Sequence, residues 1–114
     1  MDDSFTLYNL EVHVIGDPST FVCDHAPGLA FKVIGENLVF DKNTSFSMYS
    51  LAALLPLLPV KQRKTHENDW ISTDNIIACP DPHCGGRFEI TRSDTHTFKH
   101  SEVTKVPLTK EKRS

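Results

Sequence analysis

The chain has 114 residues, of which 39% are hydrophobic and 24% charged, the size and composition of one soluble globular domain. The formal net charge is −3, from 12 Lys and Arg against 15 Asp and Glu, so we expect no nucleic acid partner, because the chain lacks a general attraction for polyanions. The longest apolar run, residues 51–60, contains two prolines and is well short of the roughly 20 residues that cross a bilayer, so we expect no membrane span.

The N-terminus and the cysteine content favour a reducing location. The first five residues are acidic where a signal or transit peptide is basic, and no apolar segment follows them. Three cysteines are an odd number at low density, which suits reduced thiols better than a disulfide framework. We therefore expect a cytoplasmic protein.

The N-terminal third predicts three strands. Residues 7–15 alternate between polar and apolar side chains with the two-residue period of a half-buried strand. Residues 21–28 are too rich in Pro, Gly and Asp for regular structure. Residues 29–34 and 37–40 predict a hairpin around a Gly-Glu turn.

The middle of the chain predicts one main helix. Ser45 or Ser47 caps it, its body at residues 48–55 is rich in Leu and Ala, and Pro56 ends or kinks it. Because almost every position from 51 to 58 is apolar, we expect this segment to be buried on two sides. The sheet covers one side, and another copy of the chain or a partner protein would dock on the other through four leucines: Leu51, Leu54, Leu55 and Leu58.

The second half of the chain predicts the rest of the sheet. Residues 61–66 are basic and are expected at the solvated surface. Residues 75–79 have the β-branched content of a buried strand, and residues 87–92 alternate again. A turn at Ser93-Asp94 returns the chain as a partner strand over residues 95–103.

Together these elements predict an α+β fold. A single small domain over residues 1–106 would hold a mostly antiparallel sheet of five or six strands and one main helix. Residues 107–114 end in Lys-Glu-Lys-Arg-Ser, which predicts a flexible C-terminal tail.

The most specific motif is the segment 79–88, Cys-Pro-Asp-Pro-His-Cys-Gly-Gly-Arg-Phe. Its two thiols lie five positions apart, two prolines stiffen the loop, and two glycines permit a positive-φ turn whose N–H groups point at sulfur. The pattern is typical of a zinc knuckle with a lengthened spacing. Cys79 and Cys84 are therefore half of a candidate metal site.

The other half has to come from elsewhere, and Cys-Asp-His at residues 23–25 is the candidate. Cys23 would add a third thiolate, and either His25 or His83 would add an imidazole nitrogen. Such a ligand set suits zinc, and thiolates also admit iron. If His83 supplies the nitrogen, an open position is available for water or substrate, which is the arrangement of a catalytic metal.

Other interpretations of the same residues stay open. A buried cysteine such as Cys79 often serves only as a small apolar side chain. Cys84 can be a reactive thiol activated by the neighbouring His83. The chain can also be a small metal- or thiol-dependent lyase, isomerase or hydrolase for a small polar or aromatic compound, with Asp81 or His83 moving protons.

A polar and aromatic cluster around the single tryptophan is a candidate ligand pocket. His66 and Asp69 are its polar members, and Trp70 can stack on a ring of the ligand. Packing of Trp70 onto the domain is the alternative.

The order of these features resembles a known family. The segments concerned are the Cys23 loop, Phe-Ser-Met-Tyr-Ser-Leu-Ala-Ala-Leu-Leu-Pro from residue 46, Asn-Asp-Trp from 68, Cys-Pro-Asp-Pro-His-Cys from 79 and Arg-Phe-Glu-Ile-Thr-Arg from 87. They are similar to small uncharacterised bacterial and archaeal proteins, sometimes duplicated within one chain, that pair an early cysteine with a late Cys-Pro-Asp motif before the final strand. The match covers about residues 7–106.

What the resemblance implies is limited to the site. Cys23 and Cys79 match the cysteine positions of the family best, whereas a cysteine at the position of Cys84 occurs in a subset of the family. The family has a Gly-His pair after its first cysteine, and Cys-Asp-His at residues 23–25 departs from it. No established activity comes with the family.

Overall fold

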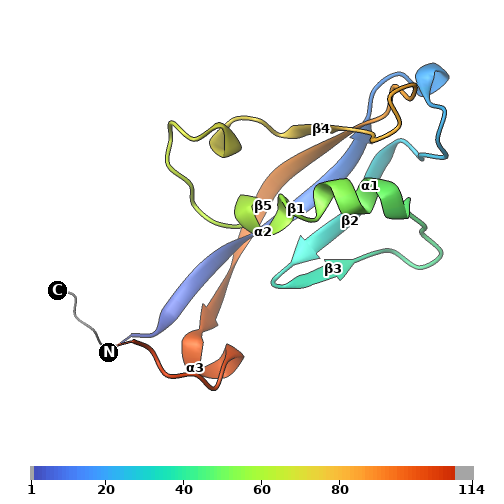
Figure 1. Ribbon diagram of the computed structural model, residues 1–114. Coiled ribbons are helices and arrows are strands. Elements are labelled where there is room, and N and C mark those ends of the chain that lie inside the picture. The colour runs from blue at the N-terminus through green and yellow to red at the C-terminus, as the bar shows by residue number, and fades with distance from the viewer. Residues whose placement is uncertain (1, 110–114) are drawn as a thin grey trace.

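The computed structural model describes residues 2–109 and contains one open antiparallel sheet with short helices packed on it (Figure 1). Its five strands lie in the order β3-β2-β1-β5-β4. Their bounds are β1 Ser4–Ile15, β2 Gly28–Ile34, β3 Asn37–Val39, β4 Ile76–Ala78 and β5 Arg87–Lys99. The helices are α1 Met48–Leu54, α2 Leu58–Lys61 and α3 His100–Val103, with 3-10 turns η1 Pro18–Thr20 and η2 Trp70–Ser72. The predicted α+β fold, with a mostly antiparallel sheet and one main helix, is therefore confirmed.

Residue 1 and residues 110–114 lie outside the described residues. The predicted flexible tail over residues 107–114 is therefore described only at residues 107–109, which are exposed and form no helix or strand. The division into a domain and a tail stays a prediction. Within residues 2–109, none of the helices combines the length and the apolar character that a bilayer crossing requires.

β1 is the central strand, and its pairing decides where the ends of its neighbours lie. It pairs antiparallel with β2 on one side and with β5 on the other. Ile15, at the end of β1, lies opposite Arg87, at the start of β5. Ala78, at the end of β4, also lies opposite Arg87. The chain that leaves β1 and the chain that joins β4 to β5 therefore meet at the same end of the sheet.

The predicted turn at Ser93-Asp94 is wrong, because β5 runs through this position as one strand of 13 residues. Ser93 and Asp94 together face the single residue Asn9 of β1, which makes a β-bulge. Asn9 Nδ2 donates a hydrogen bond of 2.8 Å to Asp94 Oδ1 and fixes this bulge. The polar side chains that favour a turn also suit a bulge, and here the pairing with the long strand β1 decides between them. The last four residues of the predicted strand 95–103 form α3 instead of extended structure.

α1 begins at one of the two predicted caps. Ser47 Oγ accepts a hydrogen bond of 3.3 Å from the N–H of Ser50, so Ser47 and not Ser45 is the N-cap. Pro56 lies between the end of α1 at Leu54 and the start of α2 at Leu58, so the main helix ends before the proline, as predicted.

The core lies between one face of the sheet and the helices α1 and α2. The even-numbered apolar residues of β1 point into it, as their alternation predicts. The helices contribute Leu54 and Leu58, which are 0% and 2% exposed. These two leucines belong to the core and not to the predicted docking face, because the sheet covers them. Leu51 is half-buried and Leu55 is exposed, so docking through these two residues stays a prediction.

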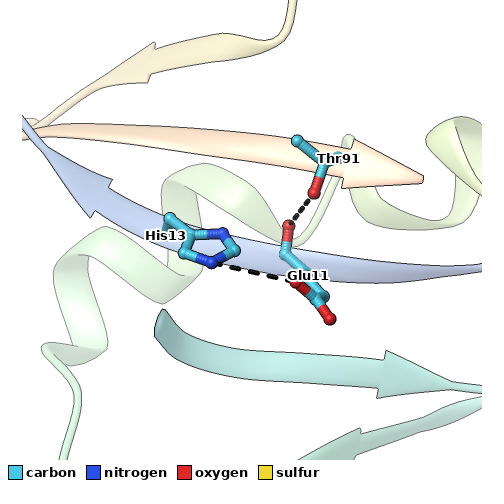
Figure 2. Close-up of polar contacts among 3 residues, drawn as sticks. All are labelled: Glu11, His13 and Thr91. Atoms are coloured by element: carbon cyan, nitrogen blue, oxygen red, sulfur yellow. Dashed lines mark hydrogen bonds and ion pairs between the residues drawn. The ribbon is translucent and has the colours of Figure 1, made fainter. Parts of the chain in front are cut away.

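The opposite face of β1 carries polar side chains. Figure 2 shows Glu11 and His13 on this face, with His13 Nε2 3.8 Å from Glu11 Oε1. Both side chains are partly exposed, so their attraction is screened by water and contributes little to stability. Thr91 of β5 donates a hydrogen bond of 3.4 Å to the backbone carbonyl of Glu11. Over residues 10–14, alternation of polar and apolar residues thus gives β1 one partly solvated face and one core face, whereas Leu7 and Asn9, further back on the face of Glu11, are buried.

The start of the basic segment 61–66 is buried, contrary to the solvated surface predicted for it. Lys61 is 3% exposed, and its Nζ donates to the carbonyl of Ile71 and, at 2.8 Å, to Asn75 Oδ1. These two acceptors replace the water that burial removes. Burial, followed by the nearby positive charge of Arg92, lowers the pKa of Lys61. The lysine therefore links α2 both to η2 and to Asn75, the residue before β4.

Gln62, the C-cap residue of α2, is a second buried polar side chain that holds this helix to the sheet. We predict that Gln62→Leu destabilises the fold. Gln62 Nε2 donates to the carbonyls of Tyr8 in β1 and Gly35 in the β2–β3 turn. The variant leaves these buried carbonyls without a donor, which costs about 1–3 kcal/mol of the free energy of unfolding. Urea denaturation measures this loss. Lys64→Gln, at an exposed position of the same segment, is the control and should change stability by less than about 0.5 kcal/mol.

The bulge gives a second prediction, on the titration of Asp94. The hydrogen bond from Asn9, which stabilises the carboxylate, holds the pKa of Asp94 below its ordinary value. The stability that this bond contributes is present above the ordinary carboxyl pKa and is lost as the pH falls through the lowered pKa of the folded protein.

We expect Asn9→Ala to raise the pKa of Asp94 toward its ordinary value, as measured by carbon NMR of the side-chain carboxyl groups. Asp17 is the internal control, because its pKa is lowered by the N–H of Ser19 and should not move. An Asp94 titration that is the same in both proteins would contradict the contact.

Candidate metal centre

Two loops meet at the end of the sheet where β1 finishes and β5 begins. The first loop, residues 16–27, joins β1 to β2, and the second loop, residues 79–86, joins β4 to β5. Figure 1 shows them side by side, in blue and orange. Gly85 of the second loop donates its N–H to the carbonyl of Thr20 in the first loop, at 2.8 Å. The strand pairing therefore brings together residues that are far apart in the sequence.

Four side chains of these loops converge, and we call them the CHCC cluster: Cys23, His25, Cys79 and Cys84. One ligand atom from each lies within 4.8 Å of the others. The two sulfur atoms of Cys23 and Cys79 are 3.7 Å apart, and His25 Nε2 lies 3.3 Å from Cys79 Sγ. Ordinary bond lengths of tetrahedral zinc require separations of roughly 3.8 Å between two sulfurs and about 3.6 Å between sulfur and nitrogen. The cluster therefore has the dimensions that a single metal ion needs.

Packing fixes the orientation of the His25 ring. The ring meets Phe88 and Phe21 edge to face, with centroid distances of 5.1 and 5.8 Å and interplanar angles of 88° and 78°. Phe88 belongs to the hydrophobic core, and so do the buried side chains of Cys79 and Cys84. The cluster is thus built on the end of the core and not on a detached loop.

Backbone N–H groups stabilise negative charge on Cys84. The N–H of Cys23 has the largest effect, burial opposes it, and the N–H groups of Gly86 and Val22 add to it, so that the pKa of Cys84 is lowered to about 6. Val22 N and Gly86 N lie 3.3 and 3.4 Å from Cys84 Sγ. The pKa of Cys23, in contrast, is raised to about 12, first by burial and then by its hydrogen bonds with the sulfurs of Cys79 and Cys84. A negative charge on one sulfur therefore disfavours ionisation of the neighbouring thiol, because the two charges repel. A bound cation would remove this repulsion.

Gly85 and Gly86 of the second loop lie so close to the first loop that no space is left for a Cβ atom. A Cβ atom on Gly85 would lie 1.9 Å from Thr20 Oγ1, and one on Gly86 would lie 2.7 Å from Cδ2 of His25. Neither glycine has a positive φ, so the predicted positive-φ turn is wrong, whereas the predicted N–H contact with sulfur is present at Gly86. The glycines make space for the first loop.

The structure separates the two candidate histidines. His25 belongs to the CHCC cluster, while the His83 side chain is exposed and outside it. The backbone N–H of His83 donates to Asp81 Oδ1 at 2.9 Å, and Asp81 Oδ2 lies 3.7 Å from Cys23 Sγ. Asp81 is thus beside the cluster. The charge on Cys84 is stabilised by backbone N–H groups and by the thiol of Cys79, and the imidazole of His83 is not among these groups.

The candidate ligand pocket around Trp70 is an exposed turn. Asp69 Oδ1 accepts the N–H of Ile71 and caps η2, and His66 Nδ1 accepts the N–H of Asn68. Trp70 is 58% exposed, so it does not pack onto the domain as the alternative required. Ligand binding by His66, Asp69 and Trp70 stays a prediction.

One residue beside the cluster was missed by sequence reasoning. Ser50 of α1 is 1% exposed and lies next to Cys23 and Cys79 in the wall of one cavity. The sequence around Ser50 indicates a helix but not its place beside the two cysteines, because that place depends on how α1 packs against the second loop.

No protein-family model, no curated protein and no solved structure matches the chain. The resemblance to the bacterial and archaeal family therefore stays a prediction.

We predict that Gly86→Ala weakens metal binding while leaving the sheet intact. The added methyl group pushes the ring of His25 away from Cys79, and displacement of a metal ligand by its supporting residues typically costs 10- to 100-fold in affinity. Competition with a chromophoric chelator measures the loss. Because Gly86 lacks a positive φ, the alanine introduces no backbone strain, and far-ultraviolet circular dichroism should be unchanged. Equal affinities of the two proteins would contradict the role assigned to His25.

Proposed function

We propose that the chain is a zinc-binding protein in which the CHCC cluster holds one Zn²⁺ ion as a structural centre. The observation that carries this proposal is the convergence of four ligand atoms within 4.8 Å. Cys23 and Cys79 are 56 residues apart, so local sequence alone does not bring them together. In a reducing cytosol, where we expect the protein, the three thiols stay available for the metal.

The ligand set favours zinc over iron. Three thiolates and one imidazole form one of the ordinary donor sets of structural zinc. Iron–sulfur clusters are usually held by four thiolates, and this chain has three cysteines. The separations within the CHCC cluster also match one ion and leave no room for inorganic sulfide. Zinc is therefore the metal that we propose.

The same geometry favours a structural role over a catalytic one. Four protein ligands complete a tetrahedron, whereas a catalytic zinc keeps one position for water or substrate. His83, which would have left such a position, is exposed and outside the cluster. A bound ion would join the first loop to the second loop. Its binding free energy would then contribute directly to folding.

Metal analysis of the purified protein tests this proposal. We expect close to one equivalent of zinc, lost in Cys79→Ser and in His25→Ala and kept in His83→Ala, which is the matched control for loss of an imidazole. A strong chelator should lower the midpoint of thermal unfolding by at least about 10 °C, because a tightly bound ligand stabilises by several kcal/mol.

Two results would overturn the structural zinc centre. Protein that carries no metal, with thermal unfolding unchanged in Cys79→Ser, would mean that the cysteines only pack in the core. A cobalt-substituted sample whose spectrum shows a coordinated, exchangeable water would mean that the site has an open position and is catalytic.

A further inference from the structure

A cavity opens beside the CHCC cluster, between α1 and the second loop. Its volume is about 280 Å³, which suits a small organic group. The wall is formed by Cys23 and Cys79 of the cluster, by Pro80 and Asp81 of the second loop, and by three residues at the start of α1: Ser47, Tyr49 and Ser50. Two of the proposed metal ligands therefore also face this cavity.

The cavity wall contains a buried hydroxyl group, that of Ser50. Ser50 is 1% exposed, and its Oγ is the one buried side-chain nitrogen or oxygen in residues 2–109 that has no hydrogen-bond partner. Buried polar groups are nearly always paired, because an unpaired one loses its bonds to water without compensation. The Ser50 hydroxyl thus has unused hydrogen-bonding capacity beside the cavity.

The charges around the cavity select a cation. Three thiolates around one Zn²⁺ ion leave the metal centre with a net negative charge. The carboxylate of Asp81 adds a second negative charge, with its Oδ2 3.7 Å from Cys23 Sγ. Within the part of the chain that the structure describes, no Lys or Arg side chain lines the cavity to balance them.

We propose that this cavity binds the ammonium group of a primary amine. An ammonium group has three donors, and four side chains in the wall carry oxygen acceptors: Asp81, Ser47, Tyr49 and the buried Ser50. Tyr49 is 76% exposed and presents an aromatic surface on which the alkyl part of the amine can lie. The amine is either a free small molecule or the side chain of a lysine in a protein partner. This inference rests on the proposed function, because the metal-bound thiolates supply part of the negative charge.

The test is an NMR titration of the zinc-loaded full chain at low ionic strength. n-Butylammonium should give saturable shifts at the start of α1 and in the second loop, while n-butanol and butyrate should not. Asp81→Asn should weaken the binding at least about 10-fold, because it removes the charge-assisted hydrogen bond. Ser50→Ala should weaken it about 3- to 10-fold. Glu36→Gln removes a carboxylate from the exposed β2–β3 turn and should have no effect.

A second arm distinguishes the two sources of the amine. A lysine tripeptide with blocked ends that binds more tightly than n-butylammonium identifies a partner's lysine, and weaker binding identifies a free amine. The proposal is overturned if butyrate or butanol binds as well as the amine, or if the amine gives no saturable shifts.

Zinc analysis of the same sample separates this inference from the proposed function. If the sample carries zinc but shows no saturable shifts with n-butylammonium, only the inference of amine binding is wrong. If the sample carries no zinc, the proposed zinc-binding function is wrong, and the inference that rests on it is wrong as well.

Discussion

The antiparallel pairing of β1 with β5 is the contact on which the rest of the molecule depends. It runs over nearly the whole length of both strands, from Ser4 opposite Lys99 to Ile15 opposite Arg87. Antiparallel strands place the end of one beside the start of the other, so the loops that flank this pair share one end of the sheet. The four members of the CHCC cluster come from those two loops. A slip of β5 by one residue would turn Phe88 out of the core and remove the support of the His25 ring.

The cluster and the core stabilise each other. Cys79 and Cys84 are buried among apolar side chains, and Phe88 contacts both the core and the imidazole of His25. A metal bound here would therefore be held by groups whose positions are already restricted by packing. Such restriction lowers the entropy that the ligands lose on binding. On the other side of the cluster, α1 borders the cavity with Ser50, so the main helix connects the core to the cavity proposed to bind an amine.

Much of this fold follows from local sequence patterns, but the site follows only in part. Residues 7–15 alternate between polar and apolar side chains, which indicates a strand, and residues 48–55 are rich in Leu and Ala, which indicates a helix. Both elements could be predicted because these signals depend only on neighbours in the chain. The bulge at Asp94 depends instead on its partner across the sheet, and turn-forming side chains do not distinguish it from a hairpin. The choice of His25 over His83 depends likewise on tertiary packing. Burial of Lys61 depends on acceptors from η2 and beyond, which no local pattern reveals.

The long separation of the ligands along the chain has a consequence for biosynthesis. The first thiol and imidazole are made early, at residues 23 and 25, but the last thiol follows only at residue 84 of 114. A growing polypeptide thus cannot assemble the full CHCC cluster until residue 84 has emerged from the ribosome. Binding of the proposed zinc ion would have to follow that point, and the nascent chain would first pass through an interval in which its early cysteine is reactive toward oxidants and competing ions.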